Sequence, residues 1–189
     1  MKRLFAISVV MLLYSAMFFV VVCTGADPVT KPLKAMWTGT LYISPNCADP
    51  GFQVPFPFSP PVFQVINVGK GVSTGSGESD WLSVICTYFT SADLSTMAGS
   101  GWGLVTAANG DTIHAQVELT VDRSTDPPRW TETETFVGGT GRFEGATGRS
   151  DSGGTWTVTD PFPSVPGIPP QLLKAPQGWV GTSIGEITF

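Results

Sequence analysis

The chain has 189 residues with 10 Lys and Arg, 15 Asp and Glu, one His and three Cys, for a net charge of −5. An acidic chain whose basic residues are scattered singly argues against nucleic acid and anionic membrane surfaces as partners. One His and so few Cys cannot form a closed Cys/His zinc site, and the carboxylates lack the spacing of a calcium loop, so we expect no metal and no cofactor.

Residues 1–26 have the pattern of a signal peptide. Lys2 and Arg3 precede an apolar run from Leu4 to Cys23, and small residues follow at 24–26. The run is long enough to cross a bilayer, so the alternative is an uncleaved N-terminal anchor, the one membrane attachment that we expect. We therefore predict a secreted or periplasmic protein. Loss of residues 1–26 removes two cations and no acid, which changes the net charge from −5 to −7.

Residues 27–189 are expected to form a single domain. Two cysteines remain there, Cys47 and Cys86, and an oxidising compartment favours a disulfide between them. Cys47 lies in a Pro-rich segment that a tether would hold, and Cys86 lies in an apolar strand. The alternative is two separate thiols.

The first half of the domain contains three predicted strands. Residues 35–44 alternate apolar and polar side chains, as in a half-buried strand, and strands are also predicted at 62–70 and 80–89. Residues 45–61 are a Pro- and Phe-rich excursion that we expect to lie across an opening or a side of the domain, the alternative being a loosely attached loop. Residues 71–79 and 90–101 are rich in Ser, Thr and Gly and are predicted loops.

The central strands are the clearest. Strands are predicted at 102–108 and 112–121, joined by a type I′ hairpin turn at Asn109-Gly110, with Asp111 completing the turn through a side-chain hydrogen bond. The second strand alternates without error, with Ile113, Ala115, Val117, Leu119 and Val121 on one face. A strand at 129–137 places Glu132 and Glu134 on one face, about 7 Å apart.

A glycine-rich corner follows at 138–148, GGTGRFEGATG. Phosphate-binding glycine loops need a strand before and a helix after, and no helical pattern follows here, so we interpret the run as a turn. Strands are predicted at 155–159 and 178–189, separated by a second Pro-rich excursion at 160–177. The residues expected to shape the two corners are Asn109, Gly110, Asp111, Gly138, Gly139, Gly141, Gly145 and Gly148.

Eight strands and no helical segment predict an all-β fold, an eight-stranded antiparallel up-and-down barrel. Closure requires the first and last strands to pair, and both carry a similar phrase, Trp37-Thr38-Gly39-Thr40 and Trp179-Val180-Gly181-Thr182. The echo fits two strands that meet at a seam. A sandwich of the same strands is the alternative.

The run AANGDTI at 107–113, then GGTGRFEGATG and a closing G-T-x-x-G strand at 181–185, resemble the allene oxide cyclase-like barrel family. Over residues 62–189 the chain most resembles its bacterial secreted members of unassigned function, which are relatives of the dirigent proteins. The resemblance implies a calycin-like barrel with a mostly apolar interior and, as in plant members, a homo-oligomer. Asn67-Val68-Gly69 stands where many bacterial relatives have His before the Val/Leu-Gly. The glutamate and asparagine of the plant cyclases have no match that the sequence identifies.

No catalytic constellation is recognisable. His114 is the one group that titrates near neutrality, but it lies on the polar face of its strand, where we expect it in solvent. Glu132 and Glu134 are likewise expected to be solvated surface acids, the alternative being a pair turned into a cavity at a spacing seen for catalytic carboxylates. No G-x-S-x-G nucleophile elbow occurs. The sequence favours binding of a small hydrophobic ligand or a partner without turnover. The alternatives are a cyclase or isomerase acting on a lipid-derived substrate, and a structural envelope protein with a solid core.

Overall fold

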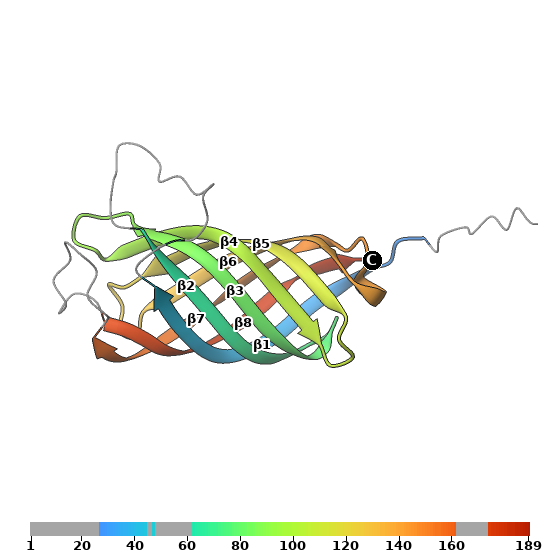
Figure 1. Ribbon diagram of the computed structural model, residues 1–189, viewed down its shortest axis with the longest axis horizontal. Helices are drawn as coiled ribbons and strands as arrows, with labels where there is room; N and C mark the ends of the chain where they lie inside the picture. Colours follow the sequence, from blue (N-terminus) through green and yellow to red (C-terminus); the bar gives the residue numbers. More distant parts are fainter. Residues whose placement is uncertain (1–26, 45–46, 48–61, 162–173) are drawn as a thin grey trace, which may run out of the picture.

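The computed structural model is a closed barrel of eight antiparallel strands (Figure 1), described for residues 27–44, 47, 62–161 and 174–189. The strands are β1 Thr30–Ser44, β2 Phe63–Ser73, β3 Gly77–Phe89, β4 Thr96–Ala107, β5 Thr112–Asp122, β6 Arg129–Gly139, β7 Thr147–Pro161 and β8 Lys174–Thr188. Each strand pairs with the next, and β8 pairs with β1, so the up-and-down barrel is confirmed and the sandwich is wrong.

The described residues contain no helix long and apolar enough to cross a membrane. Residues 1–26 lie outside the described residues, as do most of the two Pro-rich excursions, so the predicted leader and the predicted position of those excursions stay predictions.

The β5 strand forms one wall of the core, as predicted. Its five alternating apolar side chains are at most 3% exposed, whereas the even-numbered side chains from His114 to Thr120 are exposed. Successive side chains of a strand point to opposite faces, so burial of one apolar residue fixes the orientation of the others. The barrel interior is therefore the core.

The β1–β8 seam is built from the two echoed phrases. Trp37 is paired with Gly181, and Gly39 is paired with Trp179, whose ring packs against Gly39. The predicted seam is confirmed in this register.

Interior tryptophans pack over glycines of other strands. A Cβ built on any of five inward-facing glycines would collide with an indole: Gly39 and Gly69 with Trp179, Gly71 with Trp37, Gly103 with Trp81, and Gly181 with Trp130. The absence of a side chain at these positions leaves the space that the rings fill, and it lets the sheet curve tightly. Glycine and tryptophan together therefore set the width of the barrel.

Small residues also explain why several strands are longer than predicted. Residues 71–73, 77–79 and 96–101 were expected in loops but belong to β2, β3 and β4, and β7 begins at Thr147 instead of residue 155. Several of their glycines allow a close approach of another strand: a Cβ on Gly71 would strike the Trp37 ring, and one on Gly101 or Gly154 would strike the backbone of Val84 or Val180. Their composition reflects tight packing and not loop conformation.

The turn at Asn109-Gly110 differs from the prediction. Gly110 has φ +87°, but Asn109 does not have a positive φ, and the Gly110 N–H donates to Ala107 O at 2.8 Å. The Ala107 N–H donates to Asp111 O at 2.9 Å, which makes a three-residue loop with a glycine bulge. The Asn109 side chain accepts the Asp111 N–H at 3.2 Å, and this bond stabilises the longer loop.

The two glycine corners touch each other at one end of the barrel. The Asp111 carboxylate accepts the Arg142 N–H at 3.2 Å, and Thr112 N–H donates to Thr140 Oγ1 at 3.0 Å. Gly141 has φ +58°, and a Cβ there would strike the Asp111 carboxylate. Asp111 therefore joins the corners through its side chain. The other predicted corner glycines with positive φ are Gly138, Gly145 and Gly148, whereas Gly139 allows close approach of Thr112 and Phe143.

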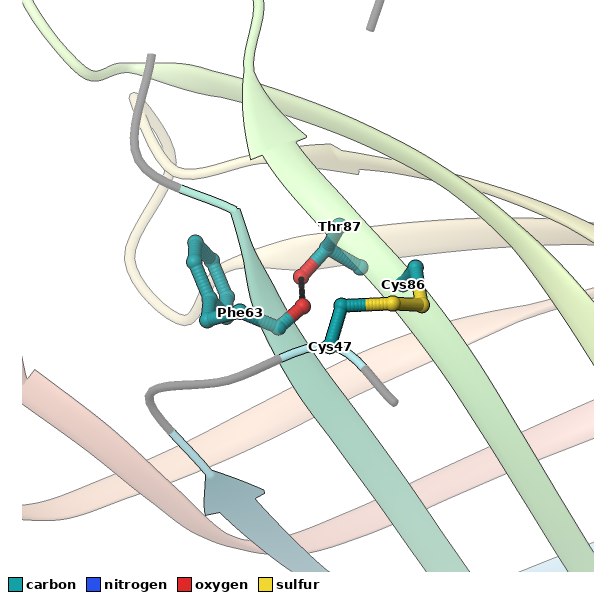
Figure 2. The surroundings of a disulfide bond; sticks show 4 residues. All are labelled: Cys47, Phe63, Cys86 and Thr87. Carbon is teal, nitrogen blue, oxygen red and sulfur yellow. Dashed lines mark hydrogen bonds between the residues drawn. A yellow bond between two sulfur atoms is a disulfide. The ribbon is translucent and has the colours of Figure 1, made fainter. Parts of the chain in front are cut away.

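The predicted disulfide between Cys47 and Cys86 is present, and the alternative of two separate thiols is wrong (Figure 2). It holds Cys47 against β3, with a Cα–Cα distance of 5.5 Å and a sequence separation of 39. Beside it, Thr87 Oγ1 donates to Phe63 O at 3.1 Å. Closing a loop of this length stabilises a fold by about 3–4 kcal/mol.

We predict that Gly39→Ala lowers stability by about 1–3 kcal/mol, because the new Cβ would meet the Trp179 ring and the Gly69 Cα at 2.7 Å. Thermal unfolding followed by circular dichroism measures the change. The control is Gly153→Ala, whose Cβ would meet its nearest neighbour, Trp130 O, at an ordinary 3.4 Å. Equal melting temperatures for the two variants would contradict the role of the seam glycine.

Candidate functional site

The barrel interior contains two carboxylic acids. Glu132 and Glu134 are 7% and 6% exposed and point inward from β6, between the buried Trp130 and Phe136. The expectation that they are solvated surface acids is wrong. The strand has one inward face, and the two aromatic residues that share this face with the glutamates bring them into the core.

Glu134 is held by a hydrogen-bonded chain that crosses four strands. Its carboxylate accepts hydrogen bonds from Ser150 and, at 2.6 Å, from Ser152, both on β7. Ser152 lies 2.6 Å from Ser183 on β8, and Ser183 Oγ accepts the Trp37 indole N–H at 2.9 Å. Because Ser152 donates to Glu134, the Ser183 hydroxyl donates to Ser152. Every donor in the chain therefore points toward Glu134.

Glu132 has no such support. In the part of the chain that the structure describes, its side chain makes no hydrogen bond to protein. Two further buried groups nearby also lack partners, the indole N–H groups of Trp130 and Trp179. Asn67 contributes its amide to the same region and donates to Ser83 Oγ at 2.9 Å. Buried polar groups without partners are rare and costly, about 1–3 kcal/mol each, which points to an occupant that completes them.

Two small cavities surround Glu132. The larger has a volume of about 30 Å³. It is lined by both glutamates and by the indoles of Trp37, Trp81, Trp130 and Trp179, and toward the end with the glycine corners by Leu33, Ser76 and Ile113. The inner one, about 10 Å³, is lined by Asn67, Trp81, Trp130, Glu132, Trp156 and Trp179. The larger cavity has room for about two water molecules, and the inner one has room for about one. Glu132 lines both cavities, so it is the polar centre of the site.

Burial is the main cause of the raised pKa values of this pair. It raises the pKa of Glu132 well above its usual range, and the neighbouring Glu134 raises it further. Burial also raises the pKa of Glu134, to about 7, but the hydrogen bonds from Ser150 and Ser152 oppose this rise. Donors that stabilise the ionised form are present only at Glu134. Glu134 is therefore the member that ionises first, and Glu132 is the member that keeps its proton.

This arrangement supports acid–base chemistry or polar recognition. A neutral carboxyl beside an ionisable one is the division of roles found in acid–base pairs. The described residues contain no cluster of three or more His, Cys, Asp or Glu side chains that would hold a metal ion.

The other candidate residues lie away from the cavities. His114 is exposed on the outside of β5, as predicted, with Nε2 at 3.2 Å from Thr112 Oγ1. The corner residues, among them Asn109 and Asp111, shape one end of the barrel. Sequence reasoning missed Asn67, Ser150, Ser152 and Ser183 as interior polar groups. Their signal was period-two alternation with core residues, for example Asn67 two positions after the buried Val65.

The fold and the site together define a closed eight-stranded barrel with a polar interior centre. No protein-family model matches the chain, and no curated protein matches it. Among solved structures, the chain is similar to the pterocarpan synthase dirigent protein GePTS1, with a TM-score of 0.44 and 14% sequence identity over 86% of each chain. A similarity at this level says nothing about the ligand or the activity of the chain.

We predict that the two glutamates make the protein less stable as pH rises. A carboxyl with a higher pKa in the folded state stabilises fully below its unfolded pKa, near 4.5, and this contribution is lost as pH rises through the folded pKa. Relative to Glu132→Gln/Glu134→Gln, the wild type should lose at least about 3 kcal/mol between pH 5 and pH 8, because each pH unit between the unfolded and folded pKa of one carboxyl costs about 1.4 kcal/mol.

Urea unfolding at a series of pH values measures this difference. Glu118→Gln, which removes an exposed acid from the outer face of β5, is the control and should keep the slope of the wild type. The burial of the acids would be contradicted by a double variant whose pH dependence equals that of the wild type.

Proposed function

We propose that this protein is an exported barrel that binds a small, mostly apolar molecule in its interior, with Glu132 and its neighbours as the polar anchor. One observation carries the proposal: within the described residues, the indole N–H groups of Trp130 and Trp179 are buried without protein partners, beside a cavity that the buried Glu132 also lines. A ligand that supplies the missing partners recovers the free energy lost by burying them.

A purely structural barrel with a solid core is less consistent with these residues. Apolar side chains at positions 132 and 134 would fill the same volume without the desolvation of two carboxyl groups. At the end of the barrel opposite the glycine corners, the fold does have a solid apolar core. Phe63, Val65, Ile85 and Val121 are at most 1% exposed there. The fold therefore does not need a polar centre in order to form.

The cavity limits the size of the bound group. Without movement, it holds a group of about the volume of two water molecules, so a larger ligand must displace a lining side chain. Trp37 is the lining indole that is only half-buried. The cavity extends from Glu132 toward Leu33, Ser76 and Ile113, so we infer that a ligand enters from the end where the glycine corners meet.

Family membership and location also belong to this proposal. The two corner motifs that resemble the allene oxide cyclase-like barrels lie side by side, joined by Asp111, which supports a shared fold. The leader pattern of residues 1–26 and the Cys47–Cys86 disulfide support an extracytoplasmic location, since disulfides persist in oxidising compartments.

A second function, isomerisation or cyclisation of a lipid-derived substrate, is favoured by the difference between the two acids. Glu132 as a neutral carboxyl would donate a proton to a bound oxygen, and Glu134 once ionised would accept a proton from carbon. Such a reaction adds and removes no atoms, and it needs no cofactor.

Native mass spectrometry of the purified protein tests the binding function. We expect a bound small molecule that is released on denaturation, and a lower occupancy in Glu132→Leu, which cannot hydrogen-bond. Trp102→Phe, on the outer surface of β4, should keep the wild-type occupancy. A protein of bare mass that also binds no added small molecule would contradict the proposal.

Chromatography of the released molecule separates the two functions. A binder returns an added molecule unchanged. An isomerase returns a product of equal mass and different retention, and Glu132→Gln abolishes that conversion.

A further inference from the structure

The unpartnered groups of the interior also specify the chemistry of the ligand. We infer that the inward end of the ligand is a single uncharged oxygen group, such as a carbonyl, ether or hydroxyl, and neither an amine nor a carboxylate. This inference rests on the proposed function and narrows it to one chemical class.

The first step is the count of donors. Trp130 and Trp179 each have a buried indole N–H without a partner, and both indoles line the inner cavity. An indole N–H donates and never accepts, so its partner must be an acceptor atom. One oxygen with two lone pairs is able to accept both bonds.

The second step excludes a positively charged group. An ammonium ion would be attracted to the two carboxyl groups and to the indole faces, but it has no lone pair. It would leave both indole N–H groups unpartnered and would place like-signed dipole ends beside its charge. An amine would therefore pair with the acids, but it would leave the two indole N–H groups without acceptors and would repel them.

The third step excludes a negatively charged group. Among the described residues, no Lys, Arg or His lines either cavity, and an anion there would lie near Glu134 of the larger cavity, the acid that its serine donors help to ionise. Repulsion and desolvation in this apolar environment both oppose it. An anion therefore satisfies the indoles and is opposed by the acids.

An uncharged oxygen satisfies both sets of groups. It accepts from the two indoles, and the nearby Glu132, which keeps its proton because it is buried without a hydrogen-bonding partner, does not repel it. If it is a hydroxyl, it also donates to the oxygen of Asn67, whose amide N–H already bonds to Ser83. The inner cavity fits one atom of this size, and the larger cavity leads away from it between indoles, so the remainder of the ligand is apolar.

Four cyclohexane derivatives of similar size test this inference: cyclohexanone, methylcyclohexane, cyclohexylamine and cyclohexanecarboxylate. Their dissociation constants are measured by quenching of tryptophan fluorescence and by isothermal titration calorimetry at pH 6.5. Cyclohexanone should bind at least fivefold more tightly than each of the other three, since one net hydrogen bond is worth a factor of about five.

Two variants assign the preference to the indole N–H groups. Trp130→Phe and Trp179→Phe keep an aromatic ring and remove the donor, so each should reduce the ratio of cyclohexanone to methylcyclohexane affinity by about threefold to tenfold. The ratio is read within each variant, so a general loosening of the barrel cancels. Trp102→Phe, on the outer surface, should leave the ratio unchanged.

The outcomes separate this inference from the proposed function. Tightest binding of cyclohexylamine or cyclohexanecarboxylate, or equal binding of methylcyclohexane, would overturn the uncharged oxygen and leave interior binding in place. An unchanged ratio in both Trp→Phe variants would overturn the role of the indoles. Binding of none of the four would mean that the cavities hold water alone, and it would overturn both proposals.

Discussion

Closure of the sheet between β1 and β8 is the constraint on which the rest of the structure depends. A barrel of eight strands has an interior only wide enough for its own side chains, so every inward position competes for the same space. Here the competition is solved by placing indoles over glycines, with Trp179 over Gly39 across the seam and Trp130 over Gly181. Without this pairing the first and last strands would be exposed edges.

The same narrow interior gives the two glutamates their character. In a wide, wet barrel both acids would be hydrated and would titrate normally. Surrounded by indoles, they lose hydration, and the serines of β7 support Glu134 but not Glu132. Packing, which sets the width of the barrel, thus also sets the difference in proton affinity on which either proposed function depends.

Much of the fold was predictable because the signals are local or repeated. The alternation in β5 identified its buried face, and the echo of the phrases at Trp37 and Trp179 identified the seam. The pairing of Cys47 with Cys86 followed from their number and the expected compartment. The type I′ turn at Asn109-Gly110 was wrong because the Asn109 side chain and the Ala107 hydrogen bonds favour a loop one residue longer.

The site was not predicted, because alternation defines two faces of a strand without saying which one is inside. In β6 the charges of Glu132 and Glu134 suggested solvent, whereas Trp130 and Phe136 on the same face decided the burial. Ser150 and Ser152 were not recognised as part of the site, because their role depends on a partner 16 or 18 residues earlier in the chain. Long-range partners of this kind are invisible to patterns read along one strand.

The most direct test of the account is a carbon-13 NMR titration of the glutamate side-chain carboxyl carbons, assigned with Glu132→Gln and Glu134→Gln. We expect Glu134 to titrate with a pKa of about 7, and Glu132 to titrate with a pKa well above its usual range. If Glu132 and Glu134 both titrated near pH 4.5, the two acids would be in water. The polar interior, and both functions proposed for it, would then be contradicted.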